Sequence, residues 1–558
     1  MPDVSLRDLS SILGPNCIGS MAQVVGLTSR PICVRDVAGR VGHNYLTQHY
    51  DHARTGWNPY EQMLTISYVK NSLKPLPDMQ LEDVNDLVEA QPLYLRDVAI
   101  QSQGTHNVVF VVTMNNWVYA FDADKSMPPL WHRLLTPGAD PFQSGWGILS
   151  TPVIDLPTKT LYVVTHSQTP DGSQVQHRLH ALDVGTGLDR PGSGIQIEAS
   201  FPGTDQHGNQ RTWTFDSHLQ LNRPGLLLQK GRLYLAFGGF NDTPPWHGWV
   251  LAYDTATLQQ VGVFNSTPDH YNPHPPQGSF EGGGGGIWQS GMGLAADPGG
   301  FIYFTTGNGL FNANQVNGRD YGDSVLKLRY DLTVADYFTP CNQEKMYEKD
   351  YDLSSGGVMV VPGCPENFLV ACGKTGRIYV LDRRSLGRYT PPIGDPCHDN
   401  VIDSHDLFFD LLGQSQAAAS ADTGVFGGPT YYETNAGRRI YYCSKPSADG
   451  HPVPLGAWAI DPNGKLALVD QSGKQFNNGA IPVISSNGST DGIVWLVDAS
   501  NNSLWELYAY DASNLSQGPL RVLDAGKWIP NPVTPYPVPT VINGKVYVPS
   551  AGKVMVFG

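Results

Sequence analysis

A short phrase of two or three apolar residues, an aspartate and a turn recurs along the chain. Most copies follow another strand-like run, such as residues 161–164 or 301–304. Short strands repeated in this way are typical of a β-propeller, in which each repeat forms one blade. The copies lie about 50 to 80 residues apart, more than one blade needs, so several blades must carry long insertions. The copies are residues 118–122, 180–183, 250–254, 326–331, 378–382, 457–461, 507–511 and a shortened one at 553–558.

We therefore predict an all-β, eight-bladed propeller over residues 44–558, with residues 1–43 as an N-terminal extension. We expect the last strands, from Val546 to Phe557, to pair with a strand from the N-terminal segment. Such pairing closes the ring and leaves no exposed sheet edge. The 61 glycines and 43 prolines agree with many tight turns between short strands.

The charge and composition restrict the partners. The formal net charge of −15 disfavours nucleic acid, whose phosphates need lysine and arginine, and it disfavours anionic membranes. No run approaches the roughly 18 apolar residues of a membrane span, so we expect no membrane insertion. We expect a small-molecule substrate and leave the oligomeric state open. The N-terminus as written carries no signal peptide, which predicts a cytoplasmic protein, or a secreted one if the chain is a mature form.

The seven cysteines show no CxxC spacing, which argues against a structural zinc site. Two pairs are open as disulfides of an exported protein, Cys17 with Cys33 and Cys341 with Cys397. Cys364 and Cys372 flank an expected strand, and we interpret both as buried. The stretch from 395 to 416 is rich in aspartate and histidine. A solvated acidic loop explains that stretch better than a metal site.

Four phrases, in this order along the chain, resemble those of the quinoprotein family. The family consists of eight-bladed propellers that hold pyrroloquinoline quinone (PQQ) on their axis, and the resemblance covers nearly all of residues 45–558. The phrases are Gly-Ile-Trp288-Gln-Ser-Gly, Thr-Thr-Gly-Asn308-Gly, Lys-Asp-Tyr-Asp352-Leu-Ser-Ser-Gly and Gly-Lys374-Thr-Gly.

The resemblance implies a role for each residue. It makes Trp288 the floor under the quinone, Asn308 a Ca²⁺ ligand, Asp352 both a ligand and the catalytic base, and Lys374 a contact to the quinone oxygens. The physical chemistry agrees, because indole offers a large flat surface and Ca²⁺ prefers carboxylate and amide oxygens. Two further positions follow from the same resemblance. Arg383 ends the Lys374 segment as a second cofactor contact, and the family's calcium-ligating glutamate falls, with one gap, on Asp242.

His218 is a candidate from the residues themselves. It lies between Asp216 and Arg223, just before an expected inner strand, where side chains can face the axial funnel. A histidine near an aspartate and an arginine can transfer protons, so we include His218 among the candidate catalytic residues. A purely structural histidine is the alternative interpretation.

The sequence also departs from the quinoprotein pattern. The family's dehydrogenases have two adjacent cysteines above the quinone, and this chain has none. The first hypothesis is therefore a PQQ- and Ca²⁺-dependent oxidoreductase acting on an alcohol or sugar. The second is an isomerase, cyclase or hydrolase that uses the same funnel without a cofactor. The third is a non-catalytic binding scaffold, because a fold does not dictate a function.

Overall fold

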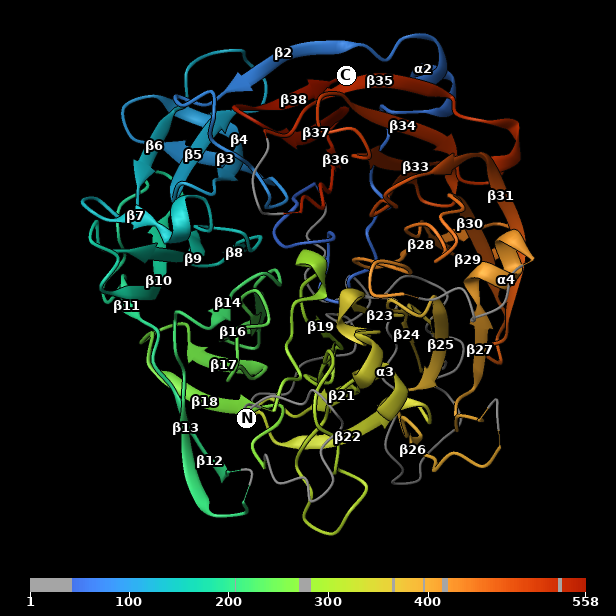
Figure 1. The fold of residues 1–558 in the computed structure, drawn as a ribbon. Helices are drawn as coiled ribbons and strands as arrows, with labels where there is room; N and C mark the ends of the chain where they lie inside the picture. The colour runs from blue at the N-terminus through green and yellow to red at the C-terminus, as the bar shows by residue number, and fades with distance from the viewer. Residues whose placement is uncertain are drawn as a thin grey trace, which may run out of the picture.

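The computed structural model describes residues 43–205, 207–269, 283–363, 367–394, 397–413, 420–529 and 534–558. Eight β-sheets stand around a central axis like the blades of a propeller (Figure 1). The predicted eight-bladed, all-β fold is confirmed. The predicted extension before residue 43, Cys17, Cys33, Cys364 and most of the glycine-rich insertion at 271–288 lie outside the described residues.

The first four blades use residues 93–339, and each is numbered here from its innermost strand outward. They are blade 1 with β3 (Leu93–Ile100), β4 (Gly104–Val112), β5 (Trp117–Asp122) and β6 (Trp131–Leu134); blade 2 with β8 (Val153–Asp155), β9 (Thr160–Gln168), β10 (Val175–Asp183) and β11 (Ile195–Gln196), to which β7 (Asp140–Pro141) is added; blade 3 with β15 (Leu227–Gln229), β16 (Arg232–Gly239), β17 (Trp249–Asp254) and β18 (Gln260–Asn265), to which β14 (Gln220–Leu221) is added; and blade 4 with β19 (Ala295–Ala296), β20 (Ile302–Thr305), β21 (Val325–Leu328), β22 (Val334–Thr339) and the later β26 (Arg388–Tyr389).

The last four blades complete the ring. They are blade 5 with β23 (Val358–Val360), β24 (Phe368–Ala371), β25 (Arg377–Asp382) and β27 (Asp403–Asp406); blade 6 with β28 (Thr430–Thr434), β29 (Gly437–Tyr442), β30 (Val453–Ile460) and β31 (Leu466–Phe476); blade 7 with β32 (Val483–Asn487), β33 (Thr490–Asp498), β34 (Trp505–Asp511) and β35 (Arg521–Gly526), to which β1 (Trp57–Asn58) is added; and blade 8 with β36 (Thr540–Ile542), β37 (Lys545–Ser550), β38 (Lys553–Phe557) and β2 (Pro75–Gln80).

The recurring sequence phrase has one structural meaning. Every copy forms the third strand of its blade, and the aspartate of each complete copy stands at the end of that strand or within three residues after it. In blade 8, the early strand β2 pairs antiparallel with the C-terminal strand β38. The predicted closure of the ring by an N-terminal strand is thus confirmed.

The chain from Tyr45 to Asn58 lies against the innermost strand, or the residue before it, of blade after blade. Because each residue or two meets a different blade, this segment ties the ring together at its centre. The bonds are Tyr45 with Tyr94, Leu46 with Ile154, Arg54 with Leu226, His52 with Ala296, Ala53 with Val360, Thr55 with Tyr431, Gly56 with Ile484 and Asn58 with Val541.

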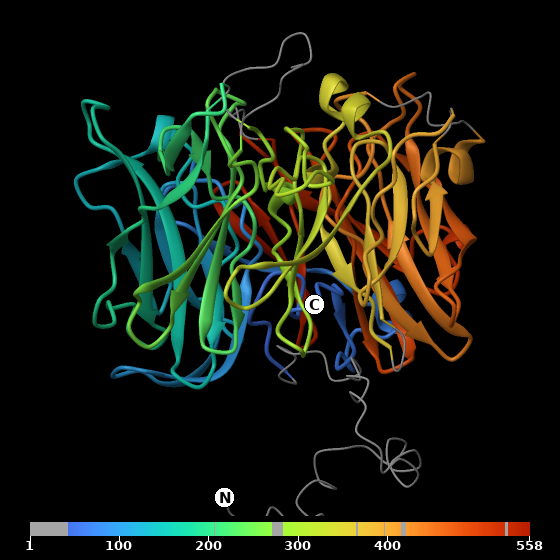
Figure 2. The same cartoon turned by 90° about the horizontal axis from the view of Figure 1, so that it is seen from below.

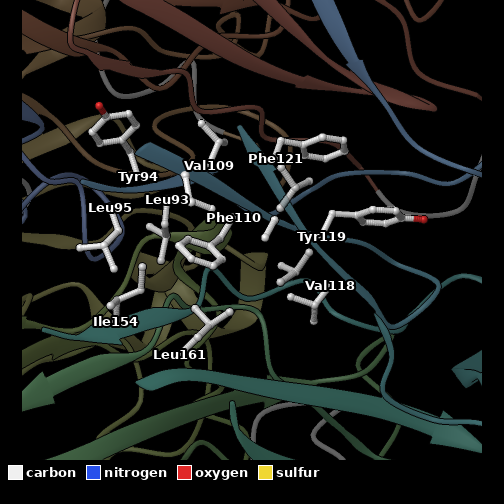
Figure 3. Packing of buried hydrophobic residues seen from close by; sticks show 14 of the residues in the cluster. Leu93, Tyr94, Leu95, Val109, Phe110, Val118, Tyr119, Phe121, Ile154 and Leu161 are labelled. Atoms are coloured by element: carbon white, nitrogen blue, oxygen red, sulfur yellow. The ribbon is translucent and has the colours of Figure 1, made fainter. Parts of the chain in front are cut away.

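The blades pack on one another through apolar side chains. In Figure 3, Phe110 and Val118 of blade 1 face Ile154 and Leu161 of blade 2 within one buried cluster. Both faces of an inner strand are covered by neighbouring blades, so β4 ends in a run of five buried residues instead of alternating. Such continuous burial is expected of strands covered on both faces.

Short helices and a hairpin occupy the connections: α2 (Ile66–Asn71), α3 (Gln343–Lys349), α4 (Leu407–Leu412), and β12 (Ser200–Thr204) with β13 (Gln210–Thr214). Viewed edge-on, α3 stands on one rim of the ring, while α2 and β2 lie toward the other (Figure 2). No helix in the described parts is long and apolar enough to cross a membrane.

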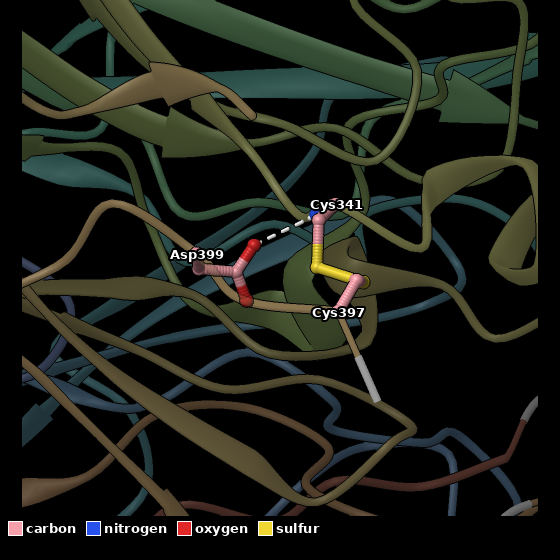
Figure 4. The surroundings of a disulfide bond; sticks show 3 residues. All are labelled: Cys341, Cys397 and Asp399. Carbon is pink, nitrogen blue, oxygen red and sulfur yellow. Dashed lines mark hydrogen bonds between the residues drawn. A yellow bond between two sulfur atoms is a disulfide. The ribbon is translucent and has the colours of Figure 1, made fainter. Parts of the chain in front are cut away.

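One of the two predicted cysteine pairs is a disulfide. Cys341 and Cys397 are joined, with their Cα atoms 6.1 Å apart, and they close a loop of 56 residues. The Asp399 carboxylate accepts a hydrogen bond of 2.7 Å from the backbone N–H of Cys341 (Figure 4). The disulfide therefore links the segment before α3 to the insertion of blade 5. Cys372 is a buried free thiol, as predicted.

Candidate functional site

The candidate site lies on one rim of the ring, where two kinds of loop meet. One kind is the turn between the second and third strands of a blade; these turns carry Asp242 in blade 3, Asn308 in blade 4, Lys374 in blade 5 and Lys445 in blade 6. The other kind is the connection that enters an innermost strand; these connections carry Trp288, Asp350, Asp352, Phe426 and Tyr536. In an antiparallel blade both kinds of loop fall on the same rim, so successive blades deliver their side chains to one place.

Trp288 forms an apolar surface at this site. It directly precedes the short 3-10 helix η3 (Gln289–Gly291), and its side chain is only half-buried. The ammonium of Lys374 lies 5.8 Å from the centre of its ring, within range of a cation–π interaction. Phe426 packs edge-on against the same indole, with ring centroids 5.8 Å apart. A flat aromatic surface with a cation beside it is therefore open to a ligand.

Lys374 holds two carboxylates together. Its Nζ lies 2.8 Å from Oδ2 of Asp352 and 3.0 Å from Oδ1 of Asp350. The side chains of Lys374 and Asp352 are only 8% and 7% exposed, whereas that of Asp350 is 45% exposed. The backbone N–H of Lys374 also donates to the carbonyl of Asp352, at 3.0 Å. The turn of blade 5 is thus fixed to the connection from blade 4.

Asn308 completes the group from blade 4. Its backbone N–H donates to Oδ1 of Asp352 at 2.6 Å, and its side-chain amide lies 3.3 Å from Oδ1 of Asp350. Gly307 allows this close approach, because a Cβ at that position would lie 2.4 Å from Oδ1 of Asp352. Both oxygens of Asp352 are therefore in use, one on Asn308 and one on Lys374.

The charges of the group influence one another. Burial, followed by the charge of Asp352, raises the pKa of Asp350 to about 6. The same two causes raise the pKa of Asp242, although its side chain reaches solvent at the edge of the site. Burial acts to lower the pKa of Lys374, but the charges of Asp352 and Asp350 outweigh it and raise that pKa. The cluster thus carries more negative than positive charge.

Asp323 lies behind this cluster and is fully buried. Its Oδ1 accepts a hydrogen bond of 3.2 Å from the backbone N–H of Leu353. Burial, followed by the charge of Asp352, raises the pKa of Asp323 well above its ordinary value. A second negative charge directly behind Asp352 is thus disfavoured.

The structure brings Trp288, Asn308, Asp352 and Lys374 together, and Asp242 stands close enough for the charge of Asp352 to contribute to its raised pKa, after burial. It does not bring the other two candidates to the group. Arg383 forms a buried ion pair of 2.7 Å with Asp297 and a 2.9 Å hydrogen bond with Asn367. These partners indicate a structural role for Arg383. Arg383 directly follows β25, whereas Lys374 precedes it, so the length of the strand separates the two residues.

His218 has local partners as well. Its ring lies 3.1 Å from the carboxylate of Asp216, and both side chains are about half exposed. Arg223, its neighbour in sequence, instead pairs with the buried Glu89 at 3.0 Å and covers the ring of Tyr536 at 4.7 Å. Within the described ranges, no contact joins His218 to the group around Lys374.

Sequence reasoning missed four residues of the site: Asp350, Phe426, Lys445 and Tyr536. Asp350 stands two residues before Asp352, at the left-handed C-cap position of α3, and its carboxylate reaches Lys374. The other three come from blades 6 and 8, in loops without a recognisable motif. The fold alone brings them beside Trp288.

The aspartate- and histidine-rich stretch after residue 395 is more ordered than a solvated loop. Part of it forms β27 and α4, where Asp406 caps the helix. His405 pairs with Asp410 at 2.9 Å, and Asp410 also accepts a hydrogen bond from the indole of Trp458. These contacts give the charged residues structural partners, which is the reason for their order.

Comparison with known proteins identifies the fold. The sequence matches no protein-family model and no curated protein. The structure matches a quinohemoprotein alcohol dehydrogenase from Pseudomonas putida HK5 with a TM-score of 0.56 and 14% identity, over 94% of this chain and 82% of that one. It also matches a quinohemoprotein alcohol dehydrogenase from Comamonas testosteroni with a TM-score of 0.52 and 16% identity, over 94% and 81% of the two chains. A europium-containing methanol dehydrogenase matches with a TM-score of 0.53 and 15% identity, over 91% and 90%.

The chain has the fold of the quinoprotein alcohol dehydrogenases. The resemblance that the sequence phrases predicted is confirmed at this level. Identities of 14 to 16% show the fold alone, and the site must carry any statement about chemistry.

Proposed function

We propose that the protein is a quinoprotein-like oxidoreductase that oxidises a hydroxyl group of an alcohol or sugar with PQQ bound on the rim of the propeller. The observation that carries the proposal is the arrangement of Trp288, Lys374 and Asp352, in which a half-exposed indole, an ammonium and a buried carboxylate adjoin one another. A planar, anionic quinone fits this set, because the indole offers a stacking surface and Lys374 offers a positive charge. The fold of the quinohemoprotein dehydrogenases supports the same conclusion.

When bound, PQQ would supply the acceptor for the hydride of the oxidised carbon. The chain's own residues would handle the proton. Asp352 accepts the proton of the substrate hydroxyl, as a general base. Asp350, which shares Lys374 with Asp352 and is partly exposed, passes that proton to solvent. Lys374 stabilises negative charge that develops on an oxygen beside it.

Calcium is a separate question. Asp242, Asn308, Asp350 and Asp352 carry the oxygen donors that Ca²⁺ prefers, and their excess negative charge would favour a cation. However, both oxygens of Asp352 are already hydrogen-bonded. Among the described residues, no group of three or more His, Cys, Asp or Glu side chains is placed to hold a metal ion. Ca²⁺ therefore stays a prediction, and no step above depends on it.

Calorimetric titration of the purified protein with PQQ, with and without Ca²⁺, tests the proposal. We expect saturable binding that Trp288→Ala abolishes and Trp288→Phe weakens only in part, because phenylalanine keeps an aromatic surface. Oxidation of alcohols and sugars, followed with an artificial electron acceptor, should then depend on PQQ and on Asp352. Absence of PQQ binding by the intact protein would overturn the proposal.

A specific observation supports one alternative function, an enzyme that uses no cofactor. Asp350, Asp352 and Lys374 form an acid–base group that needs no quinone to move protons. An isomerase, cyclase or hydrolase of a small organic molecule would use them directly. This activity is expected to survive Trp288→Ala and to be lost in Asp352→Asn, which separates it from the first proposal.

A further inference from the structure

Lys445 is the counterpart of Lys374 one blade along the ring. Each lysine stands in the turn between the second and third strands of its blade. Each donates its backbone N–H to the connection that enters its own blade, Lys374 to Asp352 at 3.0 Å and Lys445 to Gly424 at 2.9 Å. The two ammonium groups are thus delivered to the site by equivalent positions of the propeller.

The surroundings of the two lysines differ in charge. Lys374 meets Asp350 and Asp352, whereas the connection beside Lys445 continues from Gly424 into apolar Phe426. Within the described ranges, Lys445 forms no ion pair, and its ammonium lies 3.9 Å from the centre of the Phe426 ring. Lys445 is thus a half-buried cation that has an aromatic ring beside it where Lys374 has two carboxylates.

Burial lowers the pKa of Lys445. The charge of the exposed Asp422 opposes this effect, and the charges of Lys374 and Arg223 add to it. Three cations therefore share this part of the rim, and two of them, Lys374 and Arg223, already have carboxylate partners. Lys445 is the one of these three that forms no ion pair within the described ranges, so an additional negative charge would find an available cation there.

A small recess of about 20 Å³ lies beside Lys445, with room for about one water molecule or one carboxylate oxygen. Its walls include Phe426, Asn478, Gly479 and Tyr536. The ring of Tyr536 stacks on that of Phe426, with an interplanar angle of 17° and centroids 5.8 Å apart. Phe426 in turn contacts Trp288. A row of contacting aromatic rings therefore runs from the wall of the recess to Trp288 in the candidate site.

The recess is built from fixed side chains. The guanidinium of Arg223 covers the outer face of Tyr536, and Glu89 accepts a hydrogen bond from the backbone N–H of Tyr536 at 3.3 Å. The Arg223–Glu89 pair is buried, so it holds the aromatic ring and is not available to a ligand. One oxygen of a ligand carboxylate would meet Lys445 here, beside the ring of Phe426, while the rest of the ligand stays outside the recess.

We propose that Lys445, with Phe426 and Tyr536, forms a subsite for a carboxylate group of the substrate. The inference rests on the proposed function and narrows its substrate to hydroxy acids, with the hydroxyl at Asp352 and Lys374 and the carboxylate at Lys445. A bound carboxylate would give Lys445 an ion-pair partner of the kind that Lys374 already has. The group that this subsite would recognise is a carboxylate on an apolar body. The substrate is the proposed source of that carboxylate, and the quinone is the alternative source.

Binding of benzoate and its neutral counterpart benzamide to the full-length protein tests the subsite directly. We expect benzoate to bind about tenfold more tightly than benzamide, which corresponds to about 1.4 kcal/mol. Lys445→Met should remove this preference, and Lys445→Arg should keep it. Lys474→Met is the matched control, because Lys474 also lies near two aromatic rings, 5.5 and 5.6 Å from their centres, but pairs with Asp498 at 3.2 Å.

The same variants are titrated with PQQ to separate the two sources of the carboxylate. Unchanged PQQ affinity in Lys445→Met, together with loss of the benzoate preference, supports a substrate subsite. A PQQ affinity that falls about tenfold in Lys445→Met assigns Lys445 to the quinone and overturns the proposal. Equal binding of benzoate and benzamide, no binding of either, or a preference that survives Lys445→Met also overturns it. If PQQ fails to bind while the preference persists, the proposed function is wrong and the anion subsite stands.

Discussion

The ammonium of Lys374 lies 2.8 Å from Oδ2 of Asp352, and this buried pair joins the turn of blade 5 to the connection that leaves blade 4. The same ammonium reaches Asp350 at 3.0 Å. One lysine therefore balances two carboxylates and fixes the distance between two blades. Its removal should affect both the stability of the ring and the charge of the site.

We expect Lys374→Met to lower the free energy of unfolding by about 3–5 kcal/mol, since it leaves Asp352 buried and without its cation. Ca²⁺ should recover part of the loss, because the exposed oxygens then suit a divalent cation. Urea unfolding with and without Ca²⁺ measures both effects. Lys374→Arg keeps a positive charge and serves as the control. A variant as stable as the wild type, with no response to Ca²⁺, would contradict the pairing.

The two carboxylates should differ in their effect on catalysis. Asp352 is buried between Asn308 and Lys374, whereas Asp350 is partly exposed. We expect Asp352→Asn to lower kcat by about 10²–10⁴-fold, the usual contribution of a general base, with little change in KM. Asp350→Asn should lower kcat by a smaller factor, because solvent can replace it as the final proton acceptor. Equal losses in the two variants would contradict this division of roles.

The sequence predicted the ring because its repeat is local: each aspartate phrase is the third strand of one blade. It also predicted Asp352 and Lys374 as site residues, because their neighbours in sequence form recognisable phrases. Lys445 and Tyr536 lie in loops of other blades, and only closure of the ring brings them beside Trp288. The prediction of Arg383 as a cofactor contact rested on its position near Lys374 along the chain. A strand separates the two residues, and the buried partner of Arg383 is Asp297, which no sequence pattern links to it.

Arg54 illustrates a second limit of the sequence. It is fully buried at the centre of the ring, and its guanidinium donates to the carbonyls of Leu294, Gln48 and Leu226 at 2.9, 2.6 and 3.2 Å. Nothing in the order of residues 45–58 indicates that this segment meets the blades one after another. The arrangement becomes visible only from bonds that span more than two hundred residues, such as that from Arg54 to Leu294.

Arg54→Met should therefore be among the most destabilising single changes in the segment. Each buried acceptor left without a donor costs about 1–3 kcal/mol. The carbonyls of Leu294 and Gln48 lose their donor, while that of Leu226 keeps a bond of 3.4 Å from the Thr47 hydroxyl. Lys in place of Arg54 should recover only part of the loss, since one ammonium cannot reproduce the planar set of donors. Urea unfolding of both variants measures the effect. Wild-type stability in Arg54→Met would mean that the segment does not hold the ring together.

The disulfide between Cys341 and Cys397 should add stability through the chain that it closes. A loop of 56 residues corresponds to about 4 kcal/mol in the chain-entropy model. We expect Cys341→Ser with Cys397→Ser to lower the unfolding free energy by up to this amount, and a reductant to have the same effect on the wild type. Cys443→Ser, which changes a buried free thiol, controls for the loss of a sulfur atom. A reductant that destabilises the double variant as much as the wild type would contradict this explanation.

His166 and His177 should make the protein sensitive to acid. They face each other on β9 and β10, with ring centroids 3.8 Å apart, and both are buried. Burial lowers the pKa of His166 to about 3. Burial and the neighbouring His166 lower the pKa of His177 well below its ordinary value. In the unfolded chain both rings would titrate near a pKa of about 6.5.

Below about pH 6.5 the unfolded chain therefore binds protons that the folded protein does not, so stability should fall as the pH decreases from about 6.5 toward 3. His177→Phe should reduce this dependence by about one proton, because the new ring can pack on Phe215 and Phe237 without a charge to accept. The slope of the unfolding free energy between about pH 6.5 and pH 4.5 measures the number of protons. His451→Gln, at an exposed histidine, is the control. If His177→Phe leaves the slope unchanged, the acid sensitivity originates elsewhere in the protein.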